Sequence, residues 1–142
     1  RATEREKLKL LASQLDKRYE ESAEHPEKLS EARLYKLRMD HRNFHLLIAQ
    51  GASCPYLELQ IEKNQNLIFN SFYDRLFGDR RLPFQWHGLL ANALCDGDIS
   101  AADKAARRHI RHHLEEIMYR LEPYFSLNPA RLTASIKKRK NP

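Results

Sequence analysis

Apolar residues recur at intervals of three and four in five successive stretches of this chain. These stretches cover about residues 1–21, 26–50, 56–77, 83–97 and 100–121, and glycine or proline marks most of the breaks between them. In the first stretch the repeat falls on Leu8, Leu11, Leu15 and Tyr19. Such spacing lines up apolar side chains along one face of an α-helix. No strand-like alternation stands out, so the sequence predicts an all-α fold, an antiparallel bundle of about five or six helices.

The size and composition of the chain suit one soluble domain. A chain of 142 residues can bury one sizeable core, and no stretch approaches the roughly 18 apolar residues of a membrane span. Cys54 and Cys95 fit neither a disulfide framework nor a Cys-x-x-Cys zinc site, which favours reduced thiols in a cytoplasmic protein without a membrane partner. Because Pro123 and Pro129 end the helical pattern, we expect a helical domain over 1–122 and a basic tail over 123–142.

The net charge of +6 is concentrated in two places. One is the run from Lys137 to Lys140, and the other is a group of three arginines that flank a histidine on one predicted helix: Arg107, Arg108 and Arg111. A basic balance allows a nucleic-acid-binding module, with solvated helix faces and a loose tail as the alternative.

Four of the seven histidines fall at inward positions of their predicted helices. His41 and His45 are four residues apart, so their side chains project from the same face one turn apart; His87 and His109 lie on two later helices. A buried imidazole without a partner costs about 1–3 kcal/mol, and one shared divalent ion would satisfy several at once. Three or four imidazole nitrogens suit zinc, with nickel or another late first-row metal as alternatives. The pattern predicts a metal site in a central cavity.

Catalytic signatures do not accompany these histidines. The chain has no His-Glu-x-x-His sequence and no Gly-x-Ser-x-Gly elbow, and the nearest acid, Asp40, lies one position off the face of His45. The sequence therefore favours a protein that is not an enzyme. The alternative is a metal-dependent hydrolase on a helical bundle.

Two stretches resemble the FCD domain, the C-terminal effector-binding domain of FadR-type GntR transcriptional regulators. The first is Phe44-His45-Leu46-Leu47-Ile48-Ala49 with the turn Ser53-Cys54-Pro55-Tyr56-Leu57. The second begins at His87-Gly88-Leu89-Leu90-Ala91-Asn92-Ala93-Leu94, with Asp98 11 residues after His87 and His109 11 residues after Asp98. The resemblance covers about residues 5 to 121 and departs from the family at Cys54, where the turn usually has Asn.

The resemblance implies an antiparallel helical bundle with a divalent metal, often zinc or nickel, held by one Asp and three His. The matching histidines here are His45, His87 and His109. His41 stands where the family has its Asp, and a one-residue helical bulge would bring Asp40 there instead. Helix phase favours His41, because without a bulge the family's apolar positions fall on leucines.

The resemblance also implies a function and partners: a small carboxylate effector binds beside the metal and alters a dimer that grips operator DNA. In the family, an N-terminal winged helix-turn-helix domain binds the DNA. This chain lacks that domain, so we expect a fragment of a longer regulator cut at Arg1. Helix phase suggests Asn64 and Arg75 as residues that bind the acid, although Arg75 could equally reach solvent. His113, one turn after His109, could line the same cavity or lie at the edge of the core.

Overall fold

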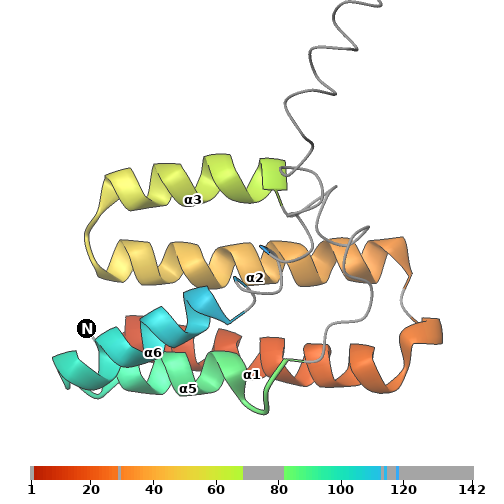
Figure 1. Cartoon of the computed structure of the whole chain (residues 1–142), viewed down its shortest axis with the longest axis horizontal. Helices are drawn as coiled ribbons and strands as arrows, with labels where there is room; N and C mark the ends of the chain where they lie inside the picture. The colour runs from red at the N-terminus through yellow and green to blue at the C-terminus, as the bar shows by residue number, and fades with distance from the viewer. Residues whose placement is uncertain (1, 29, 69–81, 113, 115–117, 119–142) are drawn as a thin grey trace, which may run out of the picture. The chain divides into compact units, whose positions relative to one another are not determined.

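The computed structural model of the chain is built from helices (Figure 1). It describes residues 2–28, 30–68 and 82–112, together with 114 and 118. Within these ranges there are five α-helices, one 3-10 turn and no strand, which confirms the predicted all-α fold. The elements are α1 (Ala2–Glu24), η1 (Pro26–Lys28), α2 (Glu31–Gly51), α3 (Pro55–Ile68), α5 (Trp86–Cys95) and α6 (Ile99–Arg111).

Helix α1 is central to the packing of the described residues. It contacts α2 along one side and α5 along another, and α2 in turn contacts α3. Successive helices run in opposite directions, and α5 runs opposite to α1 (Figure 1). The buried apolar side chains come mostly from α1, α2 and α5: Leu8, Ala12, Leu15, Leu37, Phe44, Ala49, Trp86, Leu90, Ala91 and Cys95. The core therefore lies where these three helices meet.

Local signals explain where the helices begin and end, with one difference from prediction. Pro26 begins only the short turn η1; α2 begins after Ser30, whose Oγ accepts a hydrogen bond from the backbone N–H of Arg33. Gly51 belongs to α2, and Ser53, with φ of 52°, takes a left-handed conformation in the turn that follows. Gly97, with φ of 86°, follows α5 as predicted.

Helix α3 is less deeply packed than its sequence pattern suggested. The side chain of Asn64 is exposed, although helix phase placed it inward. Within the part of the chain that the structure describes, α3 packs mainly against α2, so most of its surface is left without a neighbouring helix. The predicted continuation of this helix to residue 77 extends beyond the described residues.

The chain divides into two compact units, Arg1–Ala105 and Ala106–Pro142, and the boundary falls within α6. The start of α6 is capped by Asp98, whose Oδ1 accepts hydrogen bonds from the backbone N–H groups of Ser100 and Ala101. Among the described helices, none has the length and apolar character needed to cross a membrane.

Candidate metal centre

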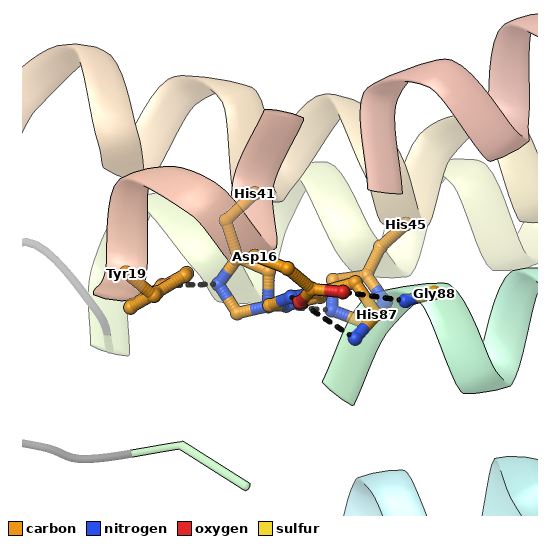
Figure 2. Close-up of polar contacts among 6 residues, drawn as sticks. All are labelled: Asp16, Tyr19, His41, His45, His87 and Gly88. Atoms are coloured by element: carbon orange, nitrogen blue, oxygen red, sulfur yellow. Dashed lines mark hydrogen bonds and ion pairs between the residues drawn. The ribbon is translucent and has the colours of Figure 1, made fainter. Parts of the chain in front are cut away.

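Three histidines from two helices meet inside the first unit. His41 and His45 come from α2 and His87 from α5. Figure 2 shows their imidazoles gathered with two α1 side chains, Asp16 and Tyr19. We call these five residues the histidine centre. His87 and Asp16 are buried, and the other three are partly buried.

His41 and His45 point the same ring nitrogen at each other. Their Nε2 atoms are 3.0 Å apart. Two nitrogens bound to one zinc ion at about 2.0–2.1 Å lie about 2.9 Å apart at a right angle and about 3.4 Å apart in a tetrahedron. A hydrogen bond between the rings has the same length, so this separation suits both a shared proton and a shared ion.

His87 adds a third imidazole to this pair. Its ring centre is 5.0 Å from that of His41, and the two rings have nitrogens within 4.8 Å of each other. His87 is wholly buried, and its Nε2 atom is inaccessible to solvent. Within the first unit, His41 therefore lies beside both of the other imidazoles, and imidazole nitrogens are common ligands of divalent metals.

Asp16 fixes the position of His87 through three hydrogen bonds. Its Oδ1 accepts from the backbone N–H of His87 at 2.9 Å and lies 2.7 Å from the ring Nδ1; its Oδ2 accepts from the backbone N–H of Gly88 at 2.8 Å. The residue at the N-cap position of α5, Gln85, has a left-handed backbone and makes no side-chain cap hydrogen bond. A carboxylate on α1 thus caps the first turn of α5, and the same carboxylate holds the ring of His87.

Aromatic side chains surround the three imidazoles. The ring of Tyr19 stacks on His87 at 5.4 Å, and its hydroxyl lies 3.3 Å from Nδ1 of His41. Phe44, which is fully buried, meets His45 and His87 edge-on at 5.5 and 5.3 Å. These contacts restrict how far the imidazoles can turn, because a close-packed ring has few alternative rotamers.

The electrostatics of the centre favour a neutral His45 and an ionised Asp16. Burial, followed by repulsion from His87, lowers the pKa of His45 to about 4. Burial acts to raise the pKa of Asp16, but the hydrogen bonds from His87 and Gly88 outweigh it, so this pKa lies below its ordinary value. Neutral imidazole is the form that binds metals, so His45 remains available as a ligand at neutral pH.

Asp40, the alternative to His41 as a ligand, faces a different neighbour. Its carboxylate pairs with the guanidinium of Arg18 on α1. His41, by contrast, lies beside His45 within hydrogen-bonding distance. Helix α2 runs without interruption through both positions, so the bulge that would have exchanged them is not formed.

The other predicted site residues are His109, Asn64, Arg75 and His113. His109 lies on α6 in the second unit. Asn64 is exposed on α3. Arg75 and His113 lie outside the described residues.

Hollows also lie in the part of the first unit that the structure describes. A half-open hollow of about 510 Å³, which we call the corner groove, is lined by Arg18, Glu21, Ser22, His25, Lys28, Arg33, Lys36 and Leu37. A smaller hollow of about 350 Å³ has Asp16 and Tyr19 in its wall, beside the acidic side chains of Glu20 and Glu24. The smaller hollow adjoins the histidine centre, but its acidic wall would repel a carboxylate.

Asp16 is the residue of this centre that sequence reasoning missed. It follows Leu8 and Ala12 at intervals of four on α1, so it belongs to the buried face of that helix. An acid at the inward phase of an amphipathic helix was the signal that could have identified it. Tyr19 was predicted on the inward stripe, but only as an apolar residue.

Comparison with protein families gives one match. The family described as the FCD domain matches residues 1–112 of the chain. Comparison with curated proteins and with solved structures gave no match.

Proposed function

This chain belongs to the FCD domain family, the C-terminal domain of GntR-family regulators, and on that premise we propose that it senses a small organic acid through a bound divalent metal. The FCD domain is a regulatory, effector-binding domain. The main observation in support of the proposed metal site is the 3.0 Å separation between the Nε2 atoms of His41 and His45. A shared ion would replace the proton between them.

Four histidines make up the proposed metal shell. His41, His45 and His87 are supported by their convergence within the first unit. His109 is added from the family pattern and from its spacing to His87. Such a shell consists of neutral ligands, and nitrogen donors of this kind suit zinc or nickel better than magnesium or calcium.

The proposed effector is a small carboxylate. When bound, the ion would supply a Lewis-acidic position to which a carboxylate oxygen can bind. Asn64, Arg75 and His113 remain our candidates for further contacts with the acid. Binding would alter a homodimer and, through it, the grip on operator DNA of the winged helix-turn-helix domain that accompanies FCD domains in GntR-family regulators.

Metal analysis combined with thermal unfolding tests this proposal. We expect about one equivalent of zinc or nickel per chain and a lower melting temperature after chelation, restored when the metal is returned. Saturation at a hundred times the dissociation constant should stabilise the folded state by about 2.7 kcal/mol. Small carboxylates should raise the melting temperature further, and only in the metal-loaded protein.

The outcome that would overturn the proposal is a protein in which neither zinc nor nickel changes the melting temperature. If the metal binds and a panel of small carboxylates has no further effect, the metal role stands and the acid-sensing role fails.

A further inference from the structure

We propose that Asp16 is a positioning residue of the metal centre, which sets the tautomer of His87 and supplies a negative charge one hydrogen bond beyond a ligand of the ion. This inference rests on the proposed metal-binding function. It adds a residue from α1, which the histidine pattern of the sequence does not include.

The tautomer follows from the hydrogen bonds of the carboxylate. Both oxygens of Asp16 already accept backbone N–H groups, those of His87 and Gly88. An oxygen that accepts in this way is also an acceptor for the ring nitrogen 2.7 Å away, so Nδ1 of His87 carries the hydrogen and donates it. A neutral imidazole with hydrogen on Nδ1 has its lone pair on Nε2. Asp16 thereby reserves Nε2 of His87 for the ion.

The need for a negative charge at Asp16 follows from the neutral ligands that would surround the ion. Imidazole ligands are neutral, so a divalent ion held by histidines alone keeps its full charge inside the protein. Asp16 is 8% exposed and lies one hydrogen bond beyond a ligand. Asp40 is engaged by Arg18 instead. A carboxylate at this position raises the basicity of the imidazole that it holds and balances part of the charge of the ion.

Tyr19 acts on His41 in the same way but more weakly. Its hydroxyl is 3.3 Å from Nδ1 of His41, longer than the 2.7 Å bond of Asp16 to His87. For both rings of the α2 pair to offer Nε2 to one ion, the proton of His41 must sit on Nδ1, where the Tyr19 oxygen can accept it. Asp16 and Tyr19 lie one turn apart on α1, so one helix orients histidines from two others.

Zinc affinity, measured by competition with a chelator, tests the role of Asp16. Asp16→Asn keeps a side-chain oxygen that can accept from His87 but removes the charge. We expect its zinc affinity to fall by about 10–100-fold. Tyr19→Phe retains the ring and should lose less than about tenfold. Leu90→Ala is the control for general destabilisation, because Leu90 is a buried core residue of α5; its affinity should stay within about twofold of wild type.

A second measurement reads the ring of His87 directly. Long-range proton–nitrogen NMR of the metal-free wild type should show the hydrogen of His87 on Nδ1. In Asp16→Ala, where no acceptor is left, a substantial fraction should move to Nε2. A purely structural role for Asp16 would leave this tautomer unchanged.

Failure of the proposed metal function and failure of the proposed role of Asp16 would give different results. Wild-type protein that binds neither zinc nor nickel would overturn the metal function itself. Zinc binding by Asp16→Asn within twofold of wild type would overturn only the role of Asp16. If Asp16→Ala does not fold, the tautomer of the wild type still decides, and hydrogen on Nε2 of His87 would contradict the inference.

Discussion

The histidine centre and the corner groove are both built on α1 and α2, yet they differ in burial, charge and order. Asp16 and Arg18 lie only two positions apart on α1. Asp16 belongs to the histidine centre, whereas Arg18 lines the corner groove. In the histidine centre Asp16 is buried and bonded to a buried imidazole at 2.7 Å. In the corner groove the cationic side chains of Lys28, Arg33 and Lys36 are exposed to solvent.

The difference shows which of the two regions is preorganised for a ligand. The rings of the histidine centre are held by packing and hydrogen bonds, so little side-chain entropy remains to be lost when they bind an ion. Long exposed lysines and arginines have most of their rotamer freedom still to lose. We therefore expect the histidine centre to determine both stability and metal binding, and the corner groove to affect neither strongly.

The largest expected contrast comes from truncating one side chain in each region. Phe44→Ala removes a fully buried ring that contacts His45 and His87, and we expect it to lower the free energy of unfolding by about 3–5 kcal/mol. Lys36→Ala in the corner groove should change it by no more than about 0.5 kcal/mol. Urea unfolding of the two variants beside wild type measures both. Comparable losses would break the contrast between the two regions.

The second contrast is in the response to acid. The pKa of His45 is lowered to about 4, whereas an unfolded histidine titrates near 6.5. The unfolded chain therefore takes up this proton first as the pH falls. The stabilisation from neutral His45 is complete above about pH 6.5 and is lost as the pH falls towards 4, by about 2–3 kcal/mol. The stabilisation from ionised Asp16 is present above its ordinary pKa near 4 and is lost only as the pH falls below that value, because the pKa of Asp16 in the folded protein is lowered.

Chemical unfolding of the metal-free protein at pH 7 and at pH 4.5 measures this response. His45→Gln should flatten the dependence between these values. His25→Gln, in the exposed corner groove, is the matched control. Its free energy of unfolding should change between the two pH values by as much as that of wild type. If the free energy of unfolding changes equally with pH in all three proteins, His45 is not the cause of the loss of stability in acid.

The smallest expected contrast uses two glycines. A Cβ added to Gly88 would lie 3.2 Å from Oδ2 of Asp16, which three hydrogen bonds hold in place. A Cβ added to Gly51 would meet nothing within 4 Å. We expect Gly88→Ala to destabilise the protein by about 1 kcal/mol, and Gly51→Ala to be neutral or stabilising by up to about 1 kcal/mol. Thermal unfolding of both variants checks the difference, and equal shifts would mean that Asp16 is not rigidly held.

Much of the fold could be predicted because helical periodicity is a local property. The spacing of apolar residues located α1, α2, α5 and α6, and the break predicted at residue 97 lies close to the end of α5. The N-terminus of α2 was wrong by several residues, because Ser30 provides a better cap than Pro26. Asn64 was placed inward because periodicity gives the phase of a helix but not how many of its sides are covered.

The candidate site was predicted in its histidines but not in what holds them. Spacing can place His41 and His45 on one face of a helix and His87 at an inward position of another, and the family pattern agrees for His45 and His87. Asp16 meets His87 from 71 positions away in the sequence, and only tertiary packing determines that contact. A lone acid among the charged residues of α1 is indistinguishable by composition from a solvated one.

The central claim is that the histidine centre binds a divalent ion, and zinc titration of two histidine variants tests it most directly. His45→Ala removes a proposed ligand from the histidine centre. His25→Ala removes an exposed histidine that pairs with Glu27 and lines the corner groove. We predict that wild type and His25→Ala bind one zinc ion with the same affinity, and that His45→Ala binds it at least about a hundredfold more weakly. Equal zinc affinity in His45→Ala and His25→Ala would contradict the account.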